Sequence, residues 1–162
     1  MFGIWRKILT GKINCNGVSK GNPSPAGASV LIRDPRGHMI LGFTNLHEHT
    51  NTFAEIYAVV KGLRYVHELG YFPITMEIDA LAVLHIINED WGNWQLQLLL
   101  TQLRQPRCMD VQFTHIFREA NQPAHHLANM AFHIQTLGTM ATTSGRLATL
   151  IRFDNIMPNF RF

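Results

Sequence analysis

The chain has 162 residues, of which 46% are hydrophobic and 15% charged, and it carries a formal net charge of +3. This length fits one domain with a single core, and the composition excludes an intrinsically disordered chain. The longest apolar stretches, such as 80–84, fall far short of the roughly 20 residues that cross a bilayer, so no membrane partner is expected.

Three β-compatible segments follow one another at the start of the chain. Residues 12–17 alternate between apolar and polar side chains, as a half-buried strand does. A cluster of turn-forming residues occupies 22–27. Two further β-compatible runs, 28–33 and 39–44, flank a short turn with Pro and Gly. The pattern predicts a three-stranded meander.

Helices and two further strands are predicted after the meander. Apolar residues recur at helical spacing over 53–69, which predicts the first helix. Periodicity then predicts, in chain order, a strand at 74–78, helical stretches at 80–87 and 94–103, a strand at 111–116 and a helix at 122–137.

This order of elements predicts the α/β class, with a mixed five-stranded sheet and helices on its faces. A right-handed crossover can place the strand at 74–78 parallel to the first strand, with Asp79 beside Asn16. Residues 1–11 are expected to be an N-terminal tail and 12–140 the domain. Residues 141–162 lack clear periodicity and are expected to be a C-terminal extension, ordered only if it docks.

Four segments match one family in order: KINCNGVSKGNPSPAG at 12–27, AEIYAVV at 54–60, MEIDA at 76–80 and HIFREANQPAHHLA at 115–128. Each is weak alone, but four in the right order are specific. Over residues 12–137 the chain resembles the ribonuclease H domain of plant retroelements. The resemblance implies a ribonuclease H-like fold, and cleavage of the RNA strand of an RNA–DNA hybrid. Four carboxylates would hold two divalent ions for that reaction, Mg²⁺ or Mn²⁺.

Two of the four implied acids are present, and two are replaced. Glu55 and Asp79 stand at family acid positions and are the candidate metal ligands. Asn16 and His125 stand where the family has Asp. Two carboxylates carry too little charge for two Mg²⁺ ions, and an imidazole shifts the preference toward Mn²⁺ or Zn²⁺. Metal binding is therefore expected to be weakened, and nuclease activity weakened or absent.

Two further residues of the matched blocks have candidate roles implied by the resemblance. His115 stands at the family's mobile histidine, which assists proton transfer or product release; a packed histidine on a strand is the equal alternative. Asn121 resembles the family's substrate-positioning asparagine, and helix capping alone would also explain it.

Polar residues in two predicted loops resemble those that contact 2′-hydroxyls across a minor groove. Without the family context they would be ordinary turn and cap residues. They are Gly17, Ser19, Asn22, Thr50, Asn51 and Thr52.

Other features are more simply structural. His47, Glu48 and His49 are expected in an exposed loop and not in a metal site. Trp91 and Trp94 are expected to pack and not to stack on bases. His125 and His126 are adjacent in a predicted helix, so they cannot form the i, i+4 pair of a zinc hydrolase.

Three functions therefore stay open. The first is an RNA–DNA hybrid endonuclease or a weakened descendant, and the second is a non-catalytic module that binds hybrid or double-stranded RNA. The third is a protein-interaction scaffold derived from a retroelement domain. With only two cysteines, a reducing compartment is expected, such as the cytoplasm or nucleus. The oligomeric state is left open.

Overall fold

The computed structural model describes residues 11–21, 24–69, 74–89, 98, 101, 111–134, 138–140 and 145–156. The predicted helical stretch at 94–103, apart from residues 98 and 101, lies outside this part of the chain. So do Asn22, the two tryptophans discussed above, Cys108 and the N-terminal tail up to residue 10.

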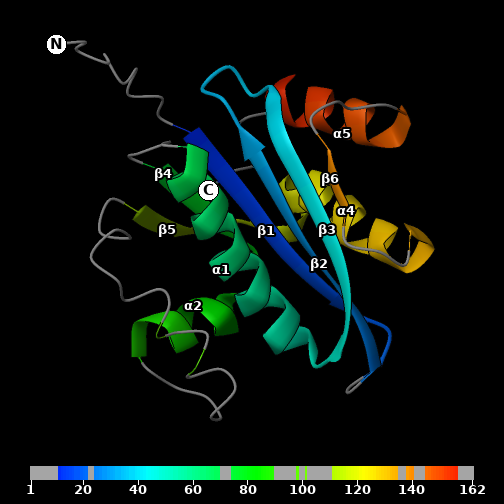
Figure 1. Cartoon of the computed structure of the whole chain (residues 1–162). Helices are drawn as coiled ribbons and strands as arrows, with labels where there is room; N and C mark the ends of the chain where they lie inside the picture. The colour runs from blue at the N-terminus through cyan, green and yellow to red at the C-terminus, as the bar shows by residue number, and fades with distance from the viewer. Residues whose placement is uncertain are drawn as a thin grey trace, which may run out of the picture.

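A mixed sheet forms the centre of the fold (Figure 1). Its strands are β1 (Gly11–Ser19), β2 (Ser24–Arg33), β3 (Met39–His49), β4 (Ile74–Ile78), β5 (Val111–His115) and β6 (Gly138–Met140). Across the sheet they lie in the order β5-β4-β1-β2-β3-β6. The antiparallel meander β1-β2-β3 and the parallel neighbours β4 and β5 are the five predicted strands. The short β6 adds an antiparallel edge to β3.

The meander strands are longer than their sequence pattern indicated. The predicted turn at 22–27 is wrong for 24–27, because Ala26 pairs with Ser19 on one side and with His47 on the other. His47, Glu48 and His49 accordingly belong to β3 and not to a loop. Hydrogen bonding to two neighbouring strands outweighs the turn preference of Pro and Gly in this segment.

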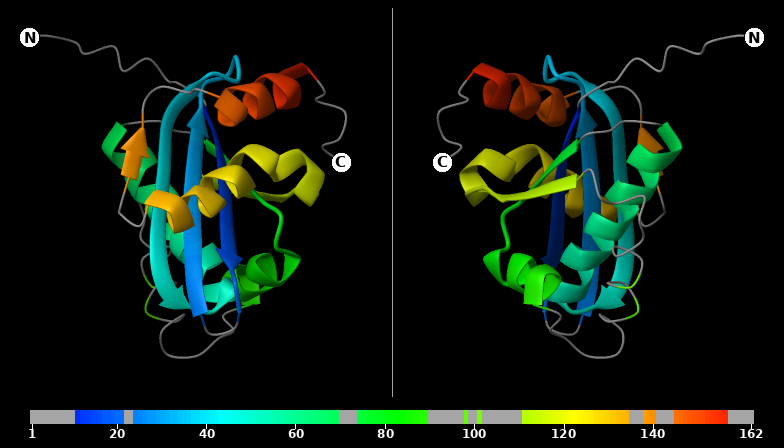
Figure 2. Two further views of the ribbon diagram at one scale, coloured as in Figure 1. Left: turned by 90° about the vertical axis from the view of Figure 1, so that its right-hand side faces the viewer. Right: turned by 90° about the vertical axis from the view of Figure 1, so that its left-hand side faces the viewer.

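Helices cover both faces of the sheet. The side views in Figure 2 place α1 (Asn51–Leu69) on one face, and α4 (Gln122–Ile134) and α5 (Gly145–Ile156) on the other. Alternation along the strands explains this arrangement, because Ile13 and Cys15 are buried in the core beside α1, whereas Leu31 packs with Leu127 of α4. The remaining helix, α2 (Leu81–Glu89), follows β4. Within the described residues, every helix lacks the length or the apolar content to span a membrane.

Helix α5 lies within the segment expected to be an extension. Leu147 and Ile151 are buried against Leu31 and Leu127, so this part of the extension is docked on α4 and the sheet. Its buried set also includes a carboxylate, Asp154. A helix that buries few apolar residues and one charge gives little periodic signal.

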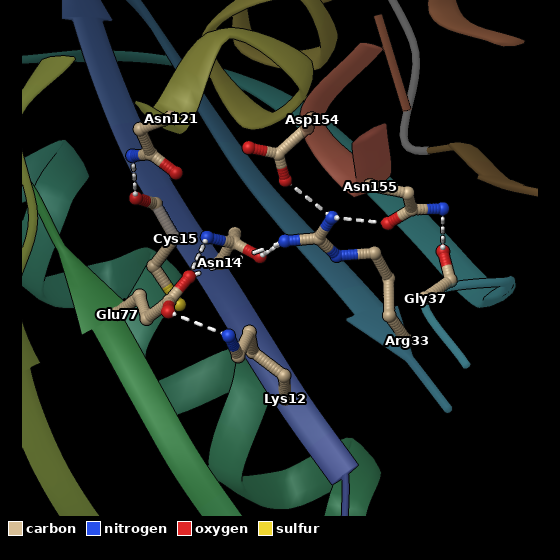
Figure 3. A network of polar contacts seen from close by, with 9 residues as sticks. All are labelled: Lys12, Asn14, Cys15, Arg33, Gly37, Glu77, Asn121, Asp154 and Asn155. Atoms are coloured by element: carbon tan, nitrogen blue, oxygen red, sulfur yellow. Dashed lines mark hydrogen bonds and ion pairs between the residues drawn. The ribbon is translucent and has the colours of Figure 1, made fainter. Parts of the chain in front are cut away.

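A buried polar network fastens α5 to the sheet (Figure 3). Arg33 of β2 is 2% exposed, and its Nη1 lies 2.5 Å from Asp154 Oδ2. Its Nη2 donates to Asn14 Oδ1 at 2.6 Å, and Asn14 Nδ2 donates to Glu77 Oε2 at 2.7 Å. Lys12 completes the chain of contacts with an ion pair to Glu77 at 2.9 Å. The network thus connects α5 to three neighbouring strands of the sheet, β2, β1 and β4.

The described cysteine is a core residue. Cys15 is buried as a free thiol, and its Sγ contacts the carbonyl oxygen of Ala58 in α1 at 3.6 Å. Burial, with the nearby charges of Glu55 and Asp79, raises the pKa of the Cys15 thiol well above its ordinary value. A buried thiol with a raised pKa is poorly reactive, so Cys15 acts as a packing residue.

Candidate functional site

The site lies where β4 ends beside β1. The parallel pairing of these strands stops at Cys15 opposite Ile78, whereas β1 continues to Ser19. Asp79 follows Ile78 directly and precedes α2. Side chains from both faces can therefore meet beyond the last residue of β4, and the carboxyl end of a parallel strand is a common place for a site.

Asn16 of β1 and His125 of α4 form the first contact of the site. Asn16 is fully buried, and its Nδ2 lies 3.0 Å from His125 Nδ1. Two hydroxyls hold α4 in place, because Ser29 donates to the Ala124 carbonyl at 2.6 Å and Thr44 to the Leu127 carbonyl at 2.7 Å. The two positions at which the family resemblance implies carboxylates therefore touch each other directly.

The close approach of α4 also depends on Gly27. A Cβ atom at this residue would lie 2.1 Å from the carbonyl oxygen of Ala128. Only glycine lets the helix backbone pack this closely on β2. The register that brings His125 to Asn16 is thus set by small and hydroxyl side chains along β2 and β3.

Glu55 reaches the site from the first turns of α1. Its side chain is buried, and the Gly17 N–H of β1 hydrogen-bonds the carboxylate. A Cβ at Gly17 would lie 2.5 Å from the Glu55 nitrogen, so glycine is required for this helix to approach β1. Burial raises the pKa of Glu55 well above its ordinary value, and the neighbouring charge of Asp79 raises it further.

Asp79 is electrostatically coupled to the other members of the site. Burial raises its pKa despite opposing effects of Asn121, Arg118 and His125. Glu55 and His125 thus lie within electrostatic range of Asp79, and His125 also contacts Asn16. The four residues that the resemblance implies as one site therefore lie in the same region of the fold.

Four buried oxygen atoms in this region have no hydrogen-bond partner. They are Asn16 Oδ1, Glu55 Oε2, Asp79 Oδ2 and Asn121 Oδ1. Each unsatisfied group of this kind costs about 1–3 kcal/mol, and oxygen atoms are the donors that hard divalent ions use. The donor set fits one Mg²⁺ or Mn²⁺ ion. It does not fit two, because Glu55 and Asp79 are the only carboxylates in this set of four residues. The described residues also contain no cluster of three or more His, Cys, Asp or Glu suited to a metal.

Asn121 ties the start of α4 to β1. It ends the short 3-10 helix η2 (Arg118–Asn121), and its Nδ2 donates to the Cys15 carbonyl at 2.9 Å (Figure 3). Its Oδ1 accepts no hydrogen bond, so the capping role considered for Asn121 is wrong. The amide instead bonds the residue that precedes Asn16 on β1, and its oxygen is buried.

His115 is placed at the edge of the site, at the end of β5. Its Nε2 lies 3.3 Å from the Asp79 carbonyl oxygen, and its ring meets Phe117 edge-on at 5.8 Å. The histidine is therefore both near the acidic pair and packed on a neighbour. These contacts leave its proposed part in proton transfer as a prediction.

The loop prediction is wrong for four of the polar residues, because Gly17 and Ser19 lie in β1 and Asn51 and Thr52 lie in α1. Gly17 lies against the first turns of α1. Thr50 is the N-cap of that helix: its Oγ1 accepts the Phe53 N–H at 3.2 Å. Asn51 is exposed, Thr52 is half-buried, and Ser19 donates to the Gly21 carbonyl. The cap explains Thr50 structurally, whereas the described contacts leave substrate binding by the others as a prediction.

Two residues that sequence reasoning missed stand at the rim of the site. Arg118 lies with its Nε 4.0 Å from Asp79 Oδ2, and its side chain is 66% exposed. Phe117 beside it is 51% exposed. Both belong to the matched block at 115–128. The signal that could have identified them is an aromatic residue followed by a cation, within the same block as Asn121 and His125.

The amino-acid sequence is similar to a protein family and to several known proteins. The family model described as reverse transcriptase-like matches residues 14–131. An Arabidopsis thaliana protein with ribonuclease H in its name is 28% identical over 151 residues, which cover 90% of this chain and 24% of that protein. The ribonuclease H of Bordetella avium is 33% identical over 91 residues, covering 56% of this chain and 58% of its own. The chain thus spans about a quarter and somewhat over half of these two relatives.

A solved structure shows the same fold. A ribonuclease H1 isolated from compost superimposes with a TM-score of 0.71 at 24% sequence identity, and the match covers 77% of this chain and 98% of the other.

Proposed function

We propose that this chain, which belongs to the ribonuclease H domain family, binds RNA–DNA hybrid at the site around Asn16 and Asp79 and cleaves it weakly or not at all with Mg²⁺. The fold supports hybrid as the ligand, since the structurally similar compost ribonuclease H1 was solved in complex with an RNA/DNA hybrid. The polar residues at the end of β1 and the start of α1 support a minor-groove contact with 2′-hydroxyls.

The observation that carries the loss of cleavage is the direct contact between Asn16 and His125. The family resemblance implies carboxylates at both positions, yet here an amide and an imidazole lie 3.0 Å apart. Neither group supplies negative charge to a divalent ion. Hydrolysis by two ions needs concentrated negative charge, because the ions repel each other at a spacing of about 3.5–4 Å.

Glu55 and Asp79 would hold a single divalent ion, with the unpartnered amide oxygens of Asn16 and Asn121 close to them. Such an ion would supply Lewis-acid stabilisation of a phosphate oxygen. Two hydrogen bonds of the chain would keep the site in shape around the ion. The Gly17 N–H fixes the Glu55 carboxylate, and the Asn121 amide fixes the start of α4 on β1.

The test measures binding and cleavage separately on the whole chain. Fluorescence anisotropy with hybrid, double-stranded RNA and DNA duplex of equal length at one salt concentration should rank the DNA duplex weakest. Gel assays with Mg²⁺ and with Mn²⁺ should give little or no RNA cleavage, with Glu55→Gln as the background control. Robust Mg²⁺-dependent cleavage that Glu55→Gln abolishes would overturn the inactivation argument. Equal affinity for all three duplexes would overturn the 2′-hydroxyl argument, and no binding at all would favour the scaffold alternative.

A further inference from the structure

The start of η2 carries an aromatic residue and a cation in succession, Phe117 at its N-cap and Arg118 as its first residue. Phe117 is 51% exposed, which is unusual for so large an apolar side chain. The next residue, Arg118, is 66% exposed. In the described part of the fold, neither side chain is covered by a neighbouring element.

Arg118 is poorly used as a stabilising ion pair. Its Nε lies 4.0 Å from the Asp79 carboxylate, and an exposed pair at that distance contributes little to folding. Its field nonetheless reaches the site, since it lowers the pKa of both Glu55 and Asp79 against the effect of burial. Guanidinium has five donors in a planar fork that matches phosphate geometry, and most of this group faces solvent.

Phe117 is held in one orientation by its neighbour. His115 meets the ring edge-on, with an angle of 78° between the ring planes and 5.8 Å between their centres. The Phe117 carbonyl also accepts the Ala120 N–H at 2.9 Å, which fixes the turn. An aromatic ring fixed at the surface can stack on a base or pack on a sugar, and such contacts tolerate any sequence.

We propose that Phe117 and Arg118 together bind one nucleotide of the nucleic acid at the site: Arg118 contacts a backbone phosphate, and Phe117 packs on the adjoining base or sugar. The pair matches the two parts of a nucleotide, an anion and an apolar ring. At a site with two carboxylates in place of four, the guanidinium supplies positive charge toward the phosphate that a second ion would otherwise supply. This inference rests on the proposed function and adds to it two residues that contact the nucleic acid.

The test compares anisotropy titrations of hybrid at several salt concentrations. Arg118→Gln should weaken binding about three- to tenfold and reduce the slope of log affinity against log salt by about one, the signature of one lost phosphate contact. Phe117→Ala and Phe117→Leu should weaken binding about three- to tenfold and leave that slope unchanged, because they remove an uncharged contact. Loss in the leucine variant shows that the ring, and not apolar bulk, is required.

Matched controls lie at the opposite end of the sheet. Arg36 is exposed in the turn after β2, and Leu69 is exposed at the end of α1. Arg36→Gln and Leu69→Ala should bind as the unmodified chain does. If the unmodified chain binds hybrid and the Arg118 and Phe117 variants, with unchanged thermal unfolding, bind equally well, the inference is wrong while the proposed function stands. A chain that binds no nucleic acid overturns both.

Discussion

Removing the Asp154 carboxylate of α5 should destabilise the fold strongly. Asp154→Ala leaves the Arg33 guanidinium buried at 2% exposure without its closest anion, which lies 2.5 Å away in the unmodified chain. Breaking a buried ion pair by removing one partner costs about 3–5 kcal/mol. The lower end applies here, because Asn14 still accepts from Arg33 and Glu77 lies 4.0 Å from it.

A loss of about 3 kcal/mol corresponds to a fall of roughly 6–12 °C in Tm for a domain of this size. Urea denaturation followed by circular dichroism should show a lower midpoint with an unchanged m value. The matched control is Asn155→Ala, whose side chain is exposed and contacts Arg33 at 3.5 Å, and it should cost less than about 1 kcal/mol. Equal effects of Asp154→Ala and Asn155→Ala would refute the conclusion that the buried pair fastens α5 to the sheet.

Three further outcomes are expected. Asn16→Asp with His125→Asp should restore Mg²⁺-dependent hybrid cleavage in a gel assay, with Asn16→Asp alone giving most of it; a folded double variant that binds but never cuts would contradict the charge argument. Gly27→Ala should lower the free energy of unfolding by about 2–3 kcal/mol, measured by thermal unfolding, because its Cβ would lie 2.1 Å from the Ala128 oxygen. An unchanged stability would show that α4 can shift at no cost. Thr50→Ala should cost about 1 kcal/mol by losing the cap on α1, whereas Thr50→Ser should not; equal losses would remove the cap explanation.

Periodicity was enough to predict the elements that bury a regular apolar face. The helix at 53–69, the strand at 74–78 and the helix beginning at Gln122 correspond to α1, β4 and α4. Three described elements were missed, the one-turn helix η2, β6 and α5, and the last two bury little apolar surface of their own. β6 has three residues and exists through pairing with Gly42–Thr44 of β3. α5 is attached partly by the ion pair between Asp154 and Arg33, and a buried ion pair does not appear in a pattern of hydrophobic residues.

The matched blocks predicted which residues would meet, but not how they would touch. The contact between Asn16 and His125 depends on how closely α4 packs on β2, which Gly27 and Ser29 decide through backbone contacts with α4. Likewise Asn121 looked like a helix cap because it precedes α4, yet its amide bonds the Cys15 carbonyl across the fold. Such long-range choices between partners leave no local signal in the sequence.

The neutral contact between Asn16 and His125 also changes what the folded chain requires from its surroundings. Four carboxylates gathered in a dry site repel one another, so a fold that contains them gains stability when cations bind to it. This chain keeps two, and links the other two positions by a hydrogen bond. Its Tm should therefore respond less to a chelator than the Tm of Asn16→Asp, which should fall in EDTA and recover with Mg²⁺. On this reasoning, a third carboxylate at residue 16 would make the stability of the fold more dependent on divalent ions.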